Sequence, residues 1–354
     1  MNKYLSLKLK VLSFILIIMV VYVHSYNYVP AFDGTGKIVS RGYNSFIQHL
    51  FSQQFLRIAL RMFFLISGYL FFLSFKSIKE DYLPKIKKRT RQVGIPFIFW
   101  SALWILIYFC LQLFPQTRNL FEGTLIREVD INGLLGTLFL HPIPFQLWSI
   151  RDLFLLALLS PILYILLKYL KYTVPIFFLV AWYLDVNFYI LSNETIAFFM
   201  VGASFSSLKN QVPTTIYTKK HAFIIPIWIA ICVTATILDY IDFKNELVIR
   251  LLHKTGILIG IMSVWVAYDI LPKIKNIEES KYFGIFSFSF FIFVFHIPLI
   301  TFVRRLLFNF GNSEFISLIV YIFTPIIVVS LSLLTGYYLK RFLPKFYKII
   351  SGGR

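Results

Sequence analysis

Apolar residues in this chain fall into long stretches that alternate with short, basic segments. A bilayer core of about 30 Å needs roughly 20 consecutive apolar residues in a helix that crosses it. By this measure the pattern predicts ten membrane-spanning helices, at residues 11–28, 55–75, 96–114, 146–167, 172–190, 194–208, 221–239, 247–270, 283–303 and 315–339. The sequence therefore predicts an all-α, polytopic integral membrane protein with a single membrane-embedded domain over residues 1–354. Pro161, Pro298 and Pro325 lie inside the fourth, ninth and tenth spans and predict kinks there.

The basic residues predict how these helices are oriented. If the N-terminus lies inside, the cytoplasmic segments contain 23 Lys and Arg residues and the outer segments contain 7. Cytoplasmic loops of membrane proteins carry an excess of Lys and Arg, so this asymmetry predicts that both termini are cytoplasmic. The loops at 29–50 and 115–145 are expected to face outward. The predicted cytoplasmic segments are 1–10, 76–91, 168–171, 209–220, 271–282 and 340–354.

Composition supports the membrane class. Hydrophobic residues make up 58% of the chain and charged residues 14%, whereas charged residues are near a quarter of an average soluble domain. The formal net charge of +19 is confined to short loops, so we interpret it as a topology signal and a contact with anionic lipids. Membrane lipids are thus expected partners and nucleic acid is not. The sequence does not specify an oligomeric state.

Motifs exclude several kinds of enzyme. Cys110 and Cys232 both lie in apolar segments, which argues against a disulfide framework. The chain contains no HExxH, CxxC, Walker or GxSxG motif. We therefore expect no metal site, and a metallohydrolase or an ATPase is disfavoured. The first apolar stretch is not followed by a small-residue cleavage site, so we expect a retained helix and not a signal peptide.

Polar residues inside the predicted spans gather at one depth. At about 1.5 Å per residue, His24 and His296 each lie roughly 20 Å from the cytoplasmic edge. Counted from the outer edge, Arg57 lies about 3 Å deep, and Arg61 and Arg151 lie about 9 Å deep. One polar residue in a span can be a satisfied packing residue, but several at one level on different helices favour a shared polar cavity.

Three further residues belong to this set. Arg250 and Lys254 add a fifth helix to it. Asp152 directly follows Arg151, and consecutive helical residues point to different faces, so we expect Asp152 to balance an arginine of another helix. Trp100 and Trp148 are interpreted as interfacial or packing residues in preference to stacking platforms for a sugar.

The chemistry of these residues suits either catalysis or the passage of a polar substrate. Imidazole titrates near neutral pH, so His24 and His296 can serve as general base, general acid or transient nucleophile. Arginines stay charged when buried and can hold a phosphate, a carboxylate or a developing oxyanion. An enzyme and a transporter are both compatible with such a cavity.

Five segments, taken in order, resemble the integral membrane acyltransferases of acyltransferase family 3, which O-acylate bacterial glycans and lipids. The segments begin at Ile15, Arg57, Lys87, Leu147 and Phe288, and read ILIIMVVYVHS, RIALRMFFLISGYLFF, KKRTRQVGIPFIFWS, LWSIRDLFLLALLSPIL and FSFFIFVFHIPLI. Each segment is weak evidence alone, but the order FF-ISGY, W-x-x-RDL and SFFIF-x-x-H is specific in combination. The resemblance runs from the first predicted helix to the tenth.

The resemblance implies a multi-pass enzyme of the bacterial cytoplasmic membrane. Its donor would be acyl-CoA, with acetyl as the expected acyl group. Its acceptor would be a hydroxyl of a cell-surface glycan or a lipid-linked saccharide. His24 would act as general base, or as a covalent acyl carrier, and the sequence leaves both open. Arg57 or Arg151 would hold the oxyanion or orient the donor phosphates, and His296 would position substrate or donor.

The donor site is where the sequence departs from the family. Many members carry an arginine eleven residues before the histidine of the first helix, and Ser13 occupies that position here. The cluster at 85–91 could compensate, with Lys87, Lys88 and Arg89 binding the CoA phosphates, although such a cluster is also an ordinary topology signal. A transporter or flippase for a polar or lipid-linked substrate stays the alternative function.

Overall fold

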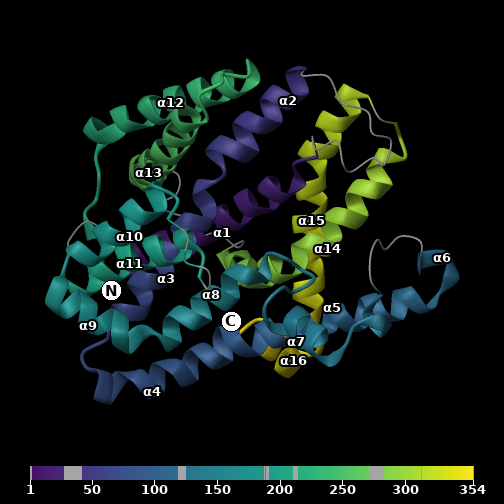
Figure 1. Ribbon diagram of the computed structural model, residues 1–354, viewed down its shortest axis with the longest axis horizontal. Coiled ribbons are helices and arrows are strands. Elements are labelled where there is room, and N and C mark those ends of the chain that lie inside the picture. The colour runs from purple at the N-terminus through teal and green to yellow at the C-terminus, as the bar shows by residue number, and fades with distance from the viewer. Residues whose placement is uncertain are drawn as a thin grey trace.

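The protein is helical throughout the part of the chain that the computed structural model describes. That part comprises residues 2–27, 42–118, 125–186, 188, 191–209, 214–271, 283–311 and 313–353. Of the predicted outer loop 29–50 it includes only residues 42–50, and of the predicted cytoplasmic segment 271–282 only residue 271. Every regular element in these ranges is a helix, and the chain is an all-α, polytopic membrane protein (Figure 1).

Seven helical stretches are long and apolar enough to cross a membrane among the described residues. They are Lys3–Ser25, Tyr43–Phe72, Ile78–Leu113, Lys219–Tyr240, Glu246–Ile270, Gly284–Phe308 and Glu314–Phe342. Each of them overlaps one of the ten predicted spans. Several extend well beyond it, because polar turns of helix continue the apolar part on one or both sides.

The three remaining predicted spans are shorter or broken. The span at 146–167 is divided into α8 (Leu147–Leu158) and α9 (Ser160–Leu170), which are bent by 65° next to Pro161, where the sequence predicted a kink. The helices α10 (Thr173–Tyr183) and α11 (Asn193–Ser207) have 11 and 15 residues. At 1.5 Å per residue these reach only about 17 and 23 Å. The described residues thus support seven spans, or eight with the bent pair, and the count of ten is not confirmed.

Two of the long stretches contain a π-helical turn. The second consists of α2 (Tyr43–Gln48), the π turn η2 (His49–Phe55) and α3 (Ile58–Phe72). The third consists of α4 (Ile78–Arg89), the π turn η3 (Thr90–Gly94) and α5 (Ile95–Leu113). The other elements are α1 (Lys3–Ser25), α6 (Pro115–Arg118), η4 (Ile126–Glu128), α7 (Ile131–Phe139), η6 (Lys219–Phe223), α12 (Ile224–Tyr240), α13 (Glu246–Ile270), η9 (Phe283–Phe288), α14 (Ser289–Phe308), α15 (Glu314–Phe342) and α16 (Pro344–Ile350).

The closest helix crossing lies between α3 and α11. A Cβ atom on Gly68 would lie 2.0 Å from the carbonyl oxygen of Phe199, and one on Gly202 would lie 1.9 Å from that of Leu65. Small residues allow helix backbones in membranes to approach in this way. The glycine of the ISGY segment therefore has a packing role, and the crossing brings the short α11 against the middle of α3.

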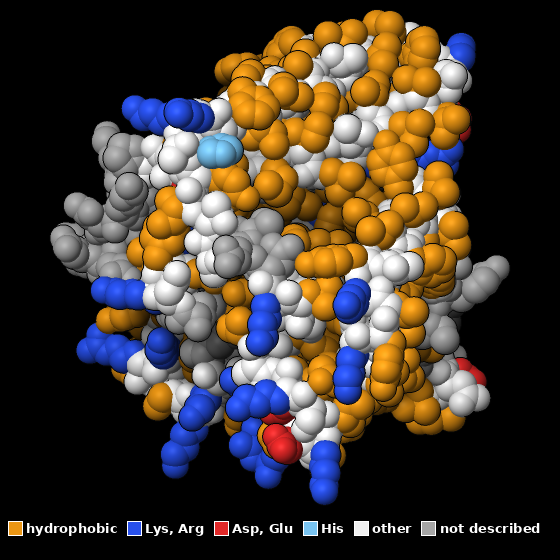
Figure 2. All heavy atoms as spheres, turned by 90° about the vertical axis from the view of Figure 1, so that its left-hand side faces the viewer, with side chains coloured by type: hydrophobic (Ala, Val, Ile, Leu, Met, Phe, Trp, Pro, Cys, Tyr) orange, Lys and Arg blue, Asp and Glu red, His pale blue; other side chains and the backbone are white. Residues whose placement is uncertain are grey.

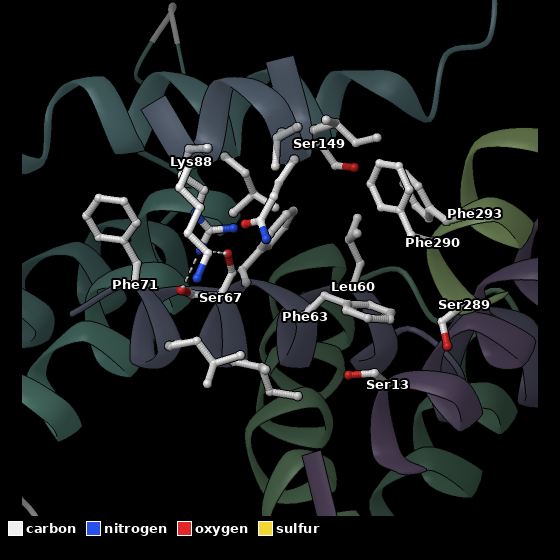
Figure 3. A pocket seen from close by; sticks show the side chains of 18 of the residues that line it. Ser13, Leu60, Phe63, Ser67, Phe71, Lys88, Ser149, Ser289, Phe290 and Phe293 are labelled. Atoms are coloured by element: carbon white, nitrogen blue, oxygen red, sulfur yellow. Dashed lines mark hydrogen bonds between the residues drawn. The ribbon is translucent and has the colours of Figure 1, made fainter. Parts of the chain in front are cut away.

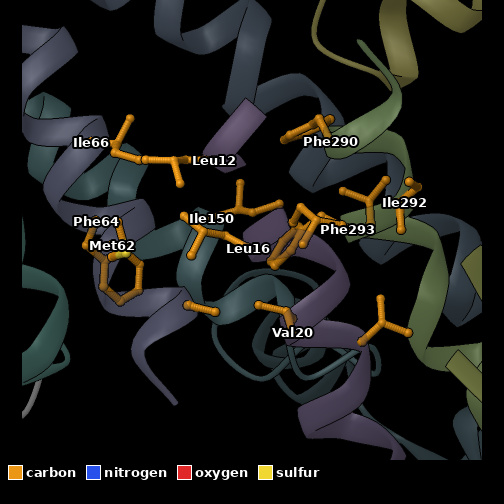
Figure 4. Close-up of a cluster of buried hydrophobic side chains, with 14 of the residues drawn as sticks. Leu12, Leu16, Val20, Met62, Phe64, Ile66, Ile150, Phe290, Ile292 and Phe293 are labelled. Atoms are coloured by element: carbon orange, nitrogen blue, oxygen red, sulfur yellow. The ribbon is translucent and has the colours of Figure 1, made fainter. Parts of the chain in front are cut away.

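The apolar core lies between α1, α3, α8 and α14. Leu12 and Leu16 of α1 pack with Phe64 of α3, Ile150 of α8 and Ile292 of α14 (Figure 4). Large apolar side chains also cover much of the outside, as expected for helices that face lipid. Figure 2 shows this apolar surface, with Lys and Arg side chains gathered toward its lower end.

Candidate active site

Two histidines face each other between α1 and α14. The ring centroids of His24 and His296 are 5.4 Å apart, and the rings are stacked with an interplanar angle of 30°. Nδ1 of His296 lies 2.7 Å from the carbonyl oxygen of Phe293 and 3.1 Å from that of Ile292. A carbonyl only accepts hydrogen bonds, so Nδ1 carries a proton, and in the neutral ring Nε2 is an acceptor. The two histidines that the sequence placed at one depth therefore do meet.

Two arginines one turn apart lie next to this pair. Arg57 and Arg61 stand at the start of α3, and Nη1 of Arg61 donates to the carbonyl oxygen of Arg57 at 2.9 Å. Nε of Arg57 donates to Oε1 of Gln53 at 3.0 Å. Arg61 forms an ion pair with Glu194, in the first turn of α11. The crossing of α3 with α11 thus supplies a carboxylate that partly balances the two guanidinium groups.

A π-helical turn directly precedes Arg57. In η2 the amide of Leu56 donates to the carbonyl oxygen of Phe51 at 2.9 Å, which is an i→i+5 bond. Such turns change the helical register and occur often at functional sites. Here the change of register falls between the polar residues of η2 and the apolar face of α3.

His24 and both arginines line a cavity of about 150 Å³, which we call the histidine cavity. Gln146, Trp148 and Glu194 also line it. The ring of Phe145 contacts that of His24 edge-on, with centroids 5.0 Å apart. The cavity therefore combines imidazole, guanidinium, carboxylate and amide groups with aromatic walls. Trp148 belongs to it, although the sequence favoured a packing role for that residue.

Arg151 lies outside this cavity. It pairs with the adjacent Asp152 at 2.9 Å and also donates to the carbonyl oxygen of Leu140. The other carboxylate oxygen of Asp152 accepts from the amide of Ser192 at 3.0 Å. The expectation that Asp152 balances an arginine of another helix is therefore wrong: the long Arg151 side chain folds back to its neighbour. This pair ties α8 to the start of α11.

A larger cavity of about 510 Å³ opens beside α4, and we call it the basic cavity (Figure 3). Lys85, Lys88 and Arg89 line it. Nη2 of Arg89 donates to Oγ of Ser67 at 3.3 Å, and Nζ of Lys85 donates to the carbonyl oxygen of Phe71 at 2.6 Å. Lys87 is exposed and is not among the lining residues. The structure thus brings two of the three predicted donor-binding residues to one cavity.

Ser13 lines the basic cavity as well. Members of acyltransferase family 3, which the sequence resembles, often carry an arginine at this position. In Figure 3 Ser13 lies on the same side of the cavity as Ser289 and on the opposite side from Lys88. The positive charge around the cavity therefore comes from α4 and not from α1.

The two cavities are adjacent. Leu60, Ser149 and Phe293 line both of them and form the wall that they share. On α1, α3 and α8, residues toward one end line the basic cavity and residues toward the other end line the histidine cavity, and on α14 Phe293 lines both. On α3, for example, Phe71 lines the basic cavity about 17 Å of helix from Leu60. The cavities are therefore arranged end to end along the helix axes.

Arg250 and Lys254 are not part of the site. Asp185, just after α10, pairs with Arg250 at 3.1 Å and also with Lys254. Nζ of Lys254 additionally donates to the carbonyl oxygens of Trp182 and Tyr183. These contacts bind α13 to the end of α10, so the prediction that these two residues share the polar cavity is not supported.

Two further histidines, His49 and His253, form a separate series of contacts. Nδ1 of His253 lies 3.1 Å from Oε1 of Gln54, and Nε2 of Gln54 lies 3.4 Å from Nε2 of His49. Nδ1 of His49 lies 3.0 Å from a carboxylate oxygen of Asp239. These contacts link α13, η2 and α12.

Sequence reasoning missed Glu194 and Gln146. Glu194 stands at the outer end of the short span 194–208, and the need to balance Arg57 and Arg61 was a usable signal for it. Gln146 is uncharged and precedes the W-x-x-RDL segment, so neither charge nor periodicity distinguishes it. Its place in the histidine cavity follows only from the packing of α8 against α14.

Comparisons with known proteins identify the family of the chain and one curated relative. A family model described as an acyltransferase domain matches residues 7–337. The succinoglycan biosynthesis protein ExoH of Rhizobium meliloti (strain 1021) is 22% identical over 365 residues, which cover 100% of this chain and 94% of that protein. No solved structure matches the chain.

Proposed function

The chain belongs to the acyltransferase 3 family of membrane O-acyltransferases, and from this premise we propose its reaction. It moves an acyl group, with acetyl as the expected group, from acyl-CoA to a hydroxyl of a cell-surface glycan or a lipid-linked saccharide. The observation that supports this most directly is the end-to-end contact of the basic cavity with the histidine cavity.

The basic cavity suits the donor. Its Lys85, Lys88 and Arg89 can attract the phosphates of CoA, because guanidinium and ammonium groups bind phosphate oxygens. The predominantly apolar wall between them and the shared residues suits a narrow, flexible thioester arm. We propose that the acyl group reaches Leu60, Ser149 and Phe293, which form the wall that the two cavities share. Lys87 would act from the exposed face of α4, through longer-range attraction.

The histidine cavity suits the acceptor and the chemistry. His24 takes the proton of the acceptor hydroxyl while the oxygen attacks the thioester carbonyl. Arg57 stabilises the negative charge that develops on the carbonyl oxygen. The carbon–sulfur bond then breaks, and the departing thiolate takes the proton from His24, so that an O-acyl ester and free CoA are formed. Arg151 acts at a distance in this scheme, by holding Asp152 and the start of α11.

A covalent route is the alternative for His24. In that route a ring nitrogen of His24 attacks the thioester, CoA leaves, and the acceptor hydroxyl then takes the acyl group from the imidazole. Incubation with radiolabelled acetyl-CoA and no acceptor separates the two routes. Rapid quenching leaves label on the protein in the covalent route and none in the direct one.

The class of acceptor rests on relatives. The printed name of ExoH places it in the biosynthesis of succinoglycan, which supports a glycan acceptor for this chain too. That relative is bacterial, which supports a site of action in a bacterial cytoplasmic membrane. The predicted orientation would bring the donor from the cytoplasm and the acceptor from the other side.

Transfer of label tests the reaction. The full-length protein in lipid nanodiscs would receive radiolabelled acetyl-CoA and unacylated surface polysaccharide from a deletion strain. We expect label in the polysaccharide, and none with His24→Ala. Folded protein that transfers no label but moves a lipid-linked sugar across liposomes would replace this proposal with the transporter or flippase.

The donor residues allow a graded test. We expect Lys88→Gln and Arg89→Gln to raise KM for acetyl-CoA more than Lys87→Gln does, since only the first two line the basic cavity. The rise should be smaller at high salt, because phosphate attraction is partly screened. Lys168→Gln on α9 changes the same charge elsewhere and serves as the control. Equal KM values in all four variants would leave these lysines and Arg89 with a topology role alone.

A further inference from the structure

Three buried polar atoms near the histidine cavity have no hydrogen-bond partner among the described residues. Nε of Arg61 and Oε1 of Gln146 belong to residues that line the cavity, and Nε2 belongs to His296, which does not line it but stacks on His24. Polar groups that are buried in proteins almost always have a partner. Three such atoms on residues that line the histidine cavity or stack on His24 indicate a ligand that supplies the missing bonds.

Gln146 is the least expected of the three. It lies just before α8 and is 2% exposed. Its side-chain Nε2 is directed to α14, 3.5 Å from the carbonyl oxygen of Val294. Its backbone carbonyl oxygen accepts from Oγ of Ser149 at 2.9 Å. These contacts fix the residue between α8 and α14. They leave Oε1 as the atom that is free to meet a ligand, one residue from the Phe145 ring that touches His24.

The unpartnered atoms specify the chemistry of that ligand. Oε1 of Gln146 and Nε2 of His296 are both acceptors, so they cannot satisfy each other and each requires an O–H or N–H donor. Nε of Arg61 is a donor and requires an acceptor. A hydroxyl group donates and accepts at once, so a compound with neighbouring hydroxyls complements the acceptor on Gln146 and the donor on Arg61, the two residues of the three that line the cavity.

We propose that Oε1 of Gln146 accepts a hydrogen bond from a hydroxyl of the acceptor sugar that neighbours the acylated one, and thereby selects which hydroxyl faces His24. Gln146 is a specificity-determining residue in this scheme, and it moves no proton. The inference rests on the proposed acyl transfer to a saccharide. It adds the residue that sets the position of the ester.

The position of the ester provides the test. The full-length enzyme in nanodiscs would receive acetyl-CoA and oligosaccharides released from unacylated surface polysaccharide, and NMR would locate the ester in the product. Gln146→Met keeps the length of the side chain but cannot accept a hydrogen bond. We expect it to raise the acceptor KM about tenfold, which corresponds to the loss of one hydrogen bond. It should also spread the ester over two hydroxyls while leaving the KM for acetyl-CoA unchanged.

Gln146→Glu keeps an acceptor oxygen and should restore a single ester position. If Gln146→Met does not fold, the Glu variant decides: one ester position supports the inference, and several positions overturn it. Thr324→Val is the matched control. Its Oγ1 is likewise buried and without a partner among the described residues, but Thr324 lies on α15 and lines neither cavity.

A folded Gln146→Met enzyme with the wild-type acceptor KM and one ester position would overturn the inference and leave the acyltransferase proposal intact. A wild-type enzyme that acylates no saccharide at all would count against the proposed function instead. The two failures are therefore distinguishable.

Discussion

His24 and His296 stack on each other but differ in what their ring nitrogens can do. Nδ1 of His296 is committed to the α14 backbone, whereas none of the described residues is hydrogen-bonded to the His24 ring in the structure. His24→Gln should therefore lower kcat by about 10²–10⁴-fold, because an amide cannot accept and return a proton near neutral pH. His296→Gln should cost less, on the order of tenfold, since it removes positioning and not proton transfer.

Rates of acyl transfer by purified, monodisperse variants would check this pair of expectations. These changes should not harm insertion, because each exchanges one uncharged polar side chain for another and adds no charge to a span. A well-expressed His24→Gln enzyme with full activity would reject His24 as base and as acyl carrier.

Ser13 offers a second test at this scale. Because Ser13 lines the basic cavity with Lys88 and Arg89, Ser13→Arg should partly replace a charge that is lost from α4. In the background of Lys88→Gln and Arg89→Gln, we expect Ser13→Arg to lower the KM for acetyl-CoA by about threefold, within the range of a single exposed charge interaction. The same change at Ser6, early in α1 and outside the cavity, is the control. No difference between the two arginine variants would remove α1 from the donor site.

Counting residues along helices predicted the meeting of His24, His296 and Arg57, because 1.5 Å per residue fixes depth in a membrane. Depth does not fix rotation about the helix axis. Arg151 and Lys254 lie on predicted spans yet reach other partners, Asp152 and Asp185, and lie outside both cavities. Long side chains follow the nearest carboxylate, and its position depends on tertiary packing that the sequence pattern does not contain.

At the scale of elements, the close packing of α3 against α11 holds Arg61 beside Glu194. An added Cβ at Gly68 or Gly202 would meet backbone atoms about 2 Å away, and backbone cannot yield as a side chain can. Gly68→Ala and Gly202→Ala should each destabilise the fold by roughly 1–3 kcal/mol, the usual cost of overpacking. They should also lower activity, because separation of the helices would part Arg61 from Glu194.

Thermal unfolding in detergent would measure the loss of stability. The matched control is Gly136→Ala on α7, where no atom lies within 4 Å of an added Cβ. Unchanged melting temperatures for the Gly68 and Gly202 variants would show that the two helices can separate without cost.

The hydrophobic pattern predicted the positions of the helices in the sequence well. It was less accurate in predicting which of these helices are long enough to span the membrane. The seven long stretches follow runs of apolar residues that exceed the thickness of a bilayer core. In α8–α9, α10 and α11 the same composition gives a bend or a short helix. Pro161 signals the bend, whereas hydrophobic periodicity contains no comparable signal for the short length of α10 and α11.

For the whole molecule, the orientation of the helical bundle in the membrane decides which of the two adjacent cavities can receive the donor and which can receive the acceptor. The basic cavity opens beside α4, within the predicted cytoplasmic segment 76–91. The segment between α12 and α13 is predicted to face outward. Both assignments rest on the distribution of Lys and Arg, and so does the prediction that the termini are cytoplasmic.

Accessibility of single cysteines tests this orientation. In a Cys110→Ser background, which removes the exposed native thiol, Lys244→Cys should react with a membrane-impermeant maleimide in intact cells. Lys79→Cys, on α4, should react only after the cells are permeabilised. Both positions are exposed in the structure, so a difference between them reports the side of the membrane and not burial. The reverse pattern would place the basic cavity outside, where acyl-CoA is absent, and would require a different donor for the reaction proposed here.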